Sequence, residues 1–172
     1  HNIHYNQVIE SFKNGKNVFV EKPLALKLTE LNIIMDSYKK NNLSLTVGFN
    51  RRFSPFTIKA KNAIGNNNSP INIIATINAG FIKKNSWVQD LEIGGGRIIG
   101  EACHFIDLIS FLTGSYVKAV VMNSNGINPK MNTDNVSILL KYENGSMGII
   151  NYFSNGNKKL SKEKIEIFDQ GR

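Results

Sequence analysis

A carboxylate, an amine and a proline follow a short apolar stretch near the start of this sequence. Val18–Val20 has the apolar, β-branched character of a buried strand, and Glu21-Lys22-Pro23 comes directly after it. Ligands of open α/β sheets bind beyond the carboxyl ends of the strands, and a proline biases the preceding residue towards an extended backbone. The tripeptide therefore predicts a lysine that faces a ligand. The alternative is a solvated turn lysine that pairs with Glu21.

A second group of ionisable side chains lies on residues 101–112, which have the periodicity of a helix. On such a helix Glu101, His104 and Asp107 follow one another at intervals of one turn, so either carboxylate is able to orient the imidazole. Histidine titrates near neutrality, which suits acid–base chemistry; the alternative is a structural histidine. Cys103, the one cysteine, lacks the second ligand pair of a zinc site, and we expect no metal.

The composition limits the class of protein. The 172 residues are 41% hydrophobic, which suits a folded core, and their formal net charge is +8. The lysines are scattered apart from one group at 158–164, and no nucleic-acid motif accompanies them. The apolar runs are too short to span a bilayer, no signal peptide is evident, and one cysteine fits a reducing compartment. We therefore expect a cytoplasmic protein with neither a nucleic-acid nor a membrane partner.

The first fifty residues alternate between helical and extended patterns. We predict helices over 4–14 and 29–41 and strands over 18–20 and 43–49. Thr29 is the expected N-cap of the second helix, and Ser54-Pro55 has the signature of a further helix start. Alternating strands and helices are typical of a parallel, doubly wound sheet.

The remainder of the sequence is richer in strands. We predict a turn at 66–68, a helix over 101–112, and strands over 71–79, 116–122, 135–142, 146–153 and 164–168. Asn144-Gly145 joins two of these strands in a hairpin, because Asn-Gly suits the positive φ angles of tight turns. The expected fold class is α/β followed by α+β: the C-terminal part of a Rossmann-type sheet in residues 1–53, then a mainly antiparallel domain in 54–172.

Four motifs occur in a fixed order. They are His1-Asn2-Ile3-His4, GKNVFVEKP at 15–23, VGFNRRFSP at 47–55 and GGGRIIGEACHFID at 94–107. With this order and spacing the chain resembles the glucose–fructose oxidoreductase/inositol dehydrogenase (Gfo/Idh/MocA-like) family of NAD(P)-dependent oxidoreductases. The resemblance implies hydride transfer between NAD or NADP and a hydroxyl of a polyol, sugar or sugar nucleotide.

The resemblance also implies roles for the candidate residues. Lys22 supplies positive charge to the substrate hydroxyl and His104 is the base. The resemblance favours no particular carboxylate as the partner of His104; Glu101 is the catalytic candidate, and Asp107 is the alternative. The cofactor-binding candidates, with His1 nearby, are His4, Glu21, Lys22 and Arg51. The substrate-binding candidates are Lys22, Arg52, Trp87, His104 and Asp107. Three alternatives stay open: one arginine pairs with a structural carboxylate, Trp87 belongs to the core, and His4 caps a helix.

Two features depart from the family pattern. Family members have Asp-x-x-x-His where this chain has Gly100, and the adjacent Glu101 is the expected replacement. The glycine-rich loop Gly-x-Gly-x-x-Gly does not occur, and by resemblance His1 falls in the middle of the dinucleotide domain. We therefore expect a chain truncated at its N-terminus and incomplete at its C-terminus, which binds cofactor poorly by itself. The alternative function is a non-catalytic sugar-binding or oligomerisation fragment; in either case we expect a homo-oligomer formed through the antiparallel sheet.

Overall fold

The computed structural model describes residues 1–65, 69–126 and 133–171, and the chain forms two compact units. The first unit contains His1–Phe49 and Lys84–Cys103, and the second contains Asn50–Lys83 and His104–Arg172. Each unit is thus built from two separate stretches of sequence. The domain division between residues 53 and 54 stays a prediction, and the contacts group residues 84–103 with the N-terminal stretch.

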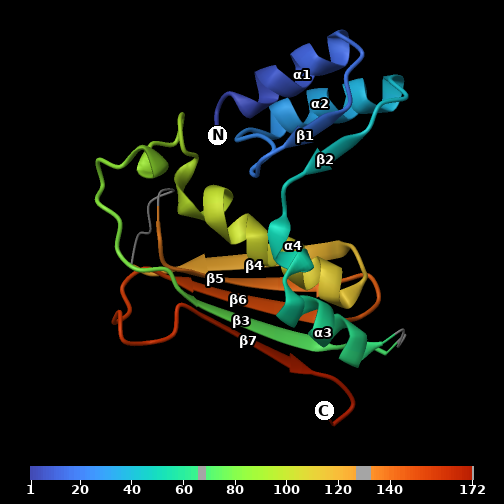
Figure 1. Cartoon of the computed structure of the whole chain (residues 1–172). Helices are drawn as coiled ribbons and strands as arrows, with labels where there is room; N and C mark the ends of the chain where they lie inside the picture. The colour runs from blue at the N-terminus through green and yellow to red at the C-terminus, as the bar shows by residue number, and fades with distance from the viewer. Residues whose placement is uncertain (66–68, 127–132, 172) are drawn as a thin grey trace. The chain divides into compact units, whose positions relative to one another are not determined.

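The first unit combines two short parallel strands with two helices. Its elements are α1 (His4–Lys13), β1 (Val18–Val20), α2 (Leu28–Lys40) and β2 (Leu45–Val47) (Figure 1). β1 and β2 run parallel, and α1 contacts both α2 and β1. Val8, Phe12, Val20, Ala25 and Ile34 form the buried core. This arrangement confirms the predicted strand–helix–strand unit of a Rossmann-type sheet.

In the first unit, the start of α2 and the length of β2 differ from the prediction. The N-cap of α2 is Lys27 rather than Thr29. The carboxylate of Glu30 accepts hydrogen bonds from the backbone N–H groups of Leu26 and Lys27, at 3.2 and 3.3 Å, which stabilises the helix start. β2 spans only Leu45–Val47 instead of 43–49, because its partner strand β1 offers three residues for pairing.

The second unit is built on a five-stranded sheet. Its elements are η1 (Asn50–Phe53), α3 (Pro55–Ile64), β3 (Asn72–Asn78), α4 (Cys103–Thr113), β4 (Val117–Ser124), β5 (Val136–Tyr142), β6 (Met147–Phe153) and β7 (Glu163–Phe168). The strand order is β4-β5-β6-β3-β7 (Figure 1). All neighbours are antiparallel except β3 and β6, which are parallel. The predicted mainly antiparallel sheet is confirmed.

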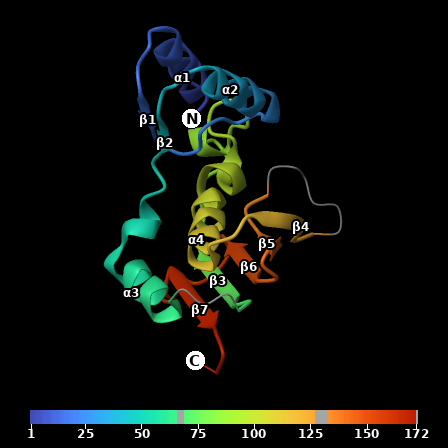
Figure 2. The ribbon, with the colours of Figure 1, turned by 90° about the vertical axis from the view of Figure 1, so that its right-hand side faces the viewer.

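One face of this sheet carries α4 (Figure 2). The β5 side chains alternate between buried and exposed, and Leu140 and Tyr142 are among the buried ones. Gly148 on β6 allows close packing, since a Cβ there would lie 2.7 Å from Ile109 Cγ2 on α4. Burial raises the pKa of Tyr142, and a hydrogen bond with Ser110 on α4 opposes that rise. The sheet therefore fixes the helix that begins with Cys103 and His104.

The predicted cap at Ser54 and the predicted turn at Asn144-Gly145 are confirmed. Ser54 caps α3 by accepting a hydrogen bond from the Thr57 amide at 3.2 Å. Gly145, in the β5–β6 hairpin, has a φ of 89°. The predicted turn at 66–68 lies outside the described residues.

The helix that the sequence predicts to begin at Glu101 begins at Cys103, as α4. A π-helical segment, η3 (Ile98–Ala102), precedes it and contains Glu101.

Candidate active site

Lys22 lies directly beyond the carboxyl end of β1, as the sequence predicts. Its Nζ donates a 2.7 Å hydrogen bond to the carbonyl oxygen of Gly100, and the peptide bond between Lys22 and Pro23 is cis. The described contacts of this ammonium include no ion pair with Glu21. The Glu21 carboxylate lies over Gly48 instead, where a Cβ would be 3.1 Å from Oε1. The ammonium is therefore held by an uncharged acceptor.

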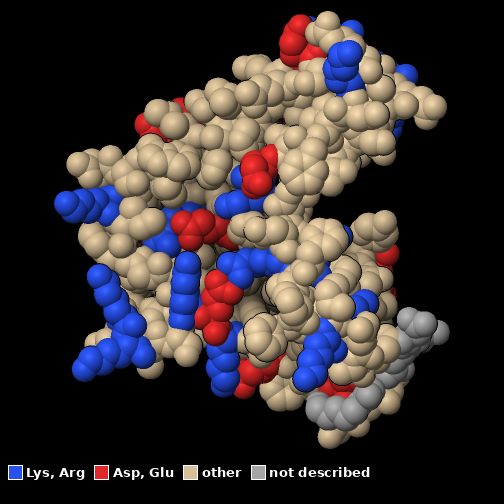
Figure 3. Space-filling model, in the orientation of Figure 1, with Lys and Arg blue, Asp and Glu red and all other residues tan. Residues whose placement is uncertain are grey.

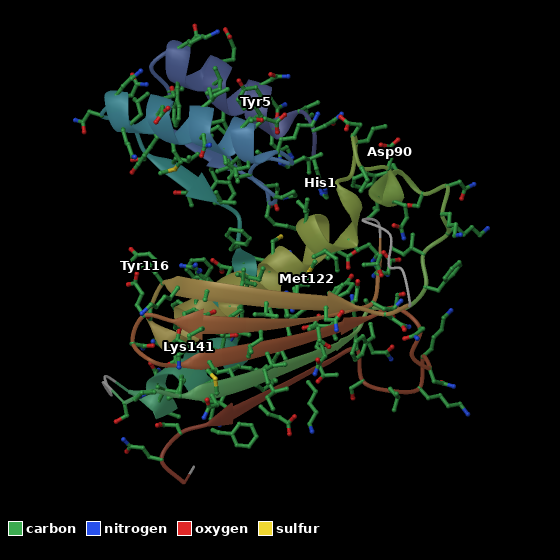
Figure 4. All side chains as sticks on the ribbon, turned by 180° about the vertical axis from the view of Figure 1, so that it is seen from behind. His1, Tyr5, Asp90, Tyr116, Met122 and Lys141 are labelled. Atoms are coloured by element: carbon green, nitrogen blue, oxygen red, sulfur yellow. The ribbon has the colours of Figure 1, made fainter. Side chains whose placement is uncertain are left out.

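Two histidines of the first unit are anchored through the same ring nitrogen. His4 Nδ1 lies 2.8 Å from the carbonyl oxygen of Pro23, and His1 Nδ1 lies 2.7 Å from that of Gly94. Because a carbonyl only accepts, Nδ1 carries the proton in both rings, and in the neutral form Nε2 keeps its lone pair. The His1 ring also meets Trp87 edge-on at 5.1 Å (His1 is labelled in Figure 4).

The glycine triplet serves close packing in the first unit. A Cβ at Gly94 would lie 2.4 Å from the Trp87 carbonyl oxygen, and one at Gly95 would lie 2.5 Å from Leu26 Cδ2. Both glycine amides donate to the Asp90 carbonyl oxygen, at 2.8 and 2.9 Å. A side chain at either position would therefore open the turn.

An exposed ion pair between Lys27 and Glu92 also links the residues around Leu26 to those before the glycine triplet. The hydrogen bond with Glu92 and its negative charge raise the pKa of Lys27.

Gly100 has a spatial reason to lack a side chain. It is buried, and a Cβ there would lie 3.1 Å from Cε1 of His1. The imidazole of His1 thus occupies the space beside this position, while the Gly100 carbonyl accepts from Lys22. The glycine at position 100, where the family pattern has an aspartate, therefore leaves room for the imidazole of His1.

Arg97 is a candidate that the sequence reasoning missed. Its side chain is only 3% exposed, and it donates to Glu101 from Nε and Nη2 at 3.2 and 3.1 Å. The spacing of four residues within a helical pattern is the signal that predicts such a pair. Glu101, proposed from sequence as a partner of His104, is therefore also the partner of a buried guanidinium.

His104 is the second residue of α4, in the second unit, and is half-buried. Asp107, one turn further on, accepts hydrogen bonds from Nε and Nη2 of Arg52. Arg51 forms a two-point ion pair with Glu163, and its guanidinium lies 4.4 Å from the centre of the Phe105 ring. Both arginines thus pair with carboxylates, where the sequence analysis expects this of at least one.

The predicted site residues therefore form two groups. Lys22, His4 and Trp87 lie in the first unit, together with Glu21 and Glu101. The second group, in the second unit, contains Arg51, Arg52, His104 and Asp107. Because Lys22 and His104 belong to different units, their convergence on one cleft stays a prediction.

The described residues were also considered for a charged patch, a metal site and a membrane-spanning helix, and they provide neither of the last two. On the face drawn in Figure 3, several Lys and Arg side chains lie beside Asp and Glu, in keeping with the ion pairs above. Over the described ranges, no three His, Cys, Asp or Glu side chains gather as a metal site. In the same part of the chain, no helix has the length and apolar character needed to cross a membrane.

Comparison with known proteins identifies the family. Residues 63–168 match the GFO/IDH/MocA C-terminal domain, and residues 1–49 match the oxidoreductase family with an NAD-binding Rossmann fold. The chain belongs to the GFO/IDH/MocA family of oxidoreductases. The predicted resemblance is thereby confirmed.

Two curated relatives are inositol dehydrogenases. Myo-inositol 2-dehydrogenase of Thermotoga maritima is 27% identical over 181 residues, which cover 97% of this chain and 51% of the relative. The scyllo-inositol 2-dehydrogenase (NAD(+)) of Bacillus subtilis is 27% identical over 154 residues, which cover 84% of this chain and 44% of the relative. The chain thus spans about half the length of the curated relatives it matches.

Solved structures share the fold. The WlbA dehydrogenase of Bordetella pertussis, in complex with NADH and UDP-GlcNAcA, has a TM-score of 0.83 and 22% identity, covering 98% of this chain and 54% of that one. An NAD binding oxidoreductase from Klebsiella pneumoniae has a TM-score of 0.82 and 22% identity, and the match covers 97% of this chain and 49% of that one.

Proposed function

We propose that the protein is a nicotinamide-dependent oxidoreductase that transfers a hydride to or from a hydroxyl-bearing carbon of a polyol, sugar or sugar nucleotide. The observation that carries the proposal is the Lys22 ammonium at the end of β1, whose described partner is the uncharged carbonyl of Gly100. Because this described partner carries no negative charge, it does not offset the positive charge that the ammonium would direct at a substrate oxygen. A positive charge aimed at a developing alkoxide lowers the barrier to hydride transfer.

The proton in this reaction is assigned to His104. When the alcohol is oxidised, its carbon loses a hydride to the cofactor and its hydroxyl proton passes to the imidazole. Lys22 stabilises the oxygen while that proton leaves. A positioned acid–base group and a positioned charge are the two contributions that this chain makes, because the cofactor supplies the hydride acceptor.

The residues at the ends of β1 and β2 suit the ribose part of the cofactor. The exposed Glu21 carboxylate fits over Gly48 only because that residue has no side chain. A carboxylate accepts hydrogen bonds from sugar hydroxyls, so Glu21 would hold the ribose of NAD or NADP, with His4 and Lys22 nearby. Arg51 and Arg52 each donate two hydrogen bonds to a carboxylate, and a guanidinium has five N–H donors, so each would keep donors for an anionic group of the cofactor or substrate.

The substrate class follows from the relatives. Two of them act, by name, on inositols, and the WlbA structure contains a UDP-sugar. Polyhydroxylated rings with a secondary hydroxyl are common to both groups. We therefore place the substrate among polyols, sugars and sugar nucleotides.

A cofactor-reduction assay tests the function. The whole protein that contains this chain is incubated with NAD or NADP and a panel of inositols, free sugars and UDP-sugars, and reduced nicotinamide is followed by absorbance. We expect turnover with at least one substrate of this class and none with simple aliphatic alcohols. Cofactor binding by calorimetry without turnover on any panel member would favour the non-catalytic alternative.

We also propose that the protein forms a homo-oligomer through the face of the sheet opposite α4. An apolar row crosses that face over four strands, through the paired residues Val121, Leu139, Ile149 and Ile74. Val121 is 65% exposed and Leu139 is 41% exposed. Such a continuous apolar row on an open sheet face is suited to burial against a second copy.

Sedimentation velocity tests the oligomer. Leu139→Glu places a charge in the middle of the apolar row, and we expect it to shift the whole protein towards monomer. The matched control is Val120→Glu, because Val120 is also exposed but pairs with Leu140 on the α4 side of the sheet. Equal sedimentation of both variants and the unmodified protein would rule out this face as the interface.

A further inference from the structure

We propose that His1 is a positioning residue, which fixes the acceptor of the Lys22 ammonium through the turn between Gly94 and Gly100. The contacts that carry this proposal involve only residues of the first unit. The expected effect of His1 on turnover rests on the proposed function, whereas its expected effect on the reactivity of the Lys22 amine does not.

The first step is the anchoring of His1 itself. Its Nδ1–H donates to the Gly94 carbonyl oxygen at 2.7 Å, and the adjacent Asn2 amide donates to the Ile93 carbonyl oxygen at 3.2 Å. The edge-on contact with Trp87 holds the plane of the ring. Two hydrogen bonds and one aromatic contact thus set the position of the imidazole against residues 87–94.

The second step connects this imidazole to Lys22. A Cβ at Gly100 would lie 3.1 Å from His1 Cε1 and 3.4 Å from the Gly94 carbonyl oxygen, so the His1 ring occupies the space beside Gly100 while it is hydrogen-bonded to Gly94. The carbonyl of this same glycine accepts the hydrogen bond from Lys22 Nζ at 2.7 Å. His1 is thus one support of Gly100, besides the backbone of η3, and we expect the loss of His1 to displace the carbonyl that holds the ammonium.

The chemistry of the ring gives a discriminating set of variants. Asparagine has an amide N–H at about the position of histidine Nδ1, so His1→Asn retains the donor to Gly94. Glutamine carries its amide one bond further out, near the position of Nε2, and His1→Gln loses that donor. His1→Leu keeps apolar bulk without any donor. If His1 acts through Nδ1, only His1→Asn should keep the hydrogen bond between Lys22 and Gly100 as it is in the unmodified protein.

Amine labelling measures the state of Lys22 without requiring any activity. The whole protein is treated briefly with an acetylating N-hydroxysuccinimide ester, and mass spectrometry compares labelling of Lys22 with that of the exposed Lys59. We expect the Lys22-to-Lys59 labelling ratio to rise about tenfold in His1→Gln and His1→Leu, the factor expected for a lost hydrogen bond to a charged group. In His1→Asn the ratio should stay close to that of the unmodified protein.

A variant at the other end of the contact provides an independent check. Gly100→Ala leaves His1 unchanged but places a Cβ against its ring, and we expect it to raise Lys22 labelling in the same way. Equal labelling in all four variants and the unmodified protein would overturn the proposal. So would a His1→Asn protein that is as reactive as His1→Leu.

Steady-state kinetics then separates this proposal from the proposed function. His1→Gln should lower kcat on the order of a hundredfold with little change in KM, because misplacing a reacting group by about 1 Å has that effect, and His1→Asn should restore most of it. If the unmodified protein has no turnover, the proposed function fails while the labelling result still stands. Altered labelling with unaltered kcat would refute a role for His1 in positioning the lysine for catalysis.

Discussion

Replacing His104 with alanine is expected to lower the turnover of the whole protein by about a hundred- to ten-thousand-fold. Proton transfer by a positioned side chain contributes this factor, and the proposed reaction assigns the hydroxyl proton to this imidazole. Lys22→Ala should cause a loss of similar size, because the proposed reaction gives this ammonium the task of stabilising the alkoxide. If both groups act on one oxygen, as proposed, the loss in the double variant should be far smaller than the product of the single losses.

The controls for this experiment separate catalysis from folding. His104 is half-buried at the start of α4, so circular dichroism should show unchanged secondary structure in His104→Ala. Ser110→Ala alters the same helix and loses hydrogen bonds with Tyr142 and the Ile106 carbonyl, neither of which is a predicted site residue, and its turnover should stay near normal. A His104→Ala protein with nearly full turnover would remove this histidine as the base.

The second large effect concerns stability. Glu101→Ala should lower the free energy of unfolding of the first unit by about 3 kcal/mol, the lower end of the cost of breaking a buried ion pair. The lower end applies because Arg97 is 3% exposed, whereas Glu101 is 34% exposed. Urea unfolding followed by the fluorescence of Trp87, which lies in this unit, measures the change.

Two further variants test the physical reason. Replacing both partners, as Arg97→Met with Glu101→Leu, should recover most of the lost stability, because the buried guanidinium is removed together with its carboxylate partner. Glu166→Ala removes the carboxylate partner of Lys164, whose side chain is 66% exposed, and should change stability by less than about 1 kcal/mol. If Glu101→Ala were as mild as Glu166→Ala, the ion pair with Arg97 would not be a substantial source of stability.

The elements that could be predicted are those whose signals are local. The apolar spacing in 4–14, the Ser54-Pro55 cap and the Asn144-Gly145 hairpin each involve residues close together in sequence, and each is confirmed. The boundary at Thr29 was wrong because Glu30 supplies the capping contacts from inside the helix. The parallel pairing of β3 with β6 was not specified, because register between strands more than seventy residues apart has no local signal.

The candidate site divides in the same way. Sequence by itself determined the family, the placement of Lys22 at the end of a strand, and a helix that carries His104, since these follow from residue types and spacing. Only the tertiary structure decided two of the partners: Gly100 for Lys22 and Arg52 for Asp107. Both pairs join residues more than fifty positions apart, whereas the pair of Arg97 and Glu101 has the local spacing of four residues. Such contacts are set by how whole units pack, because the folded backbone, rather than the neighbouring sequence, brings the donors and acceptors together.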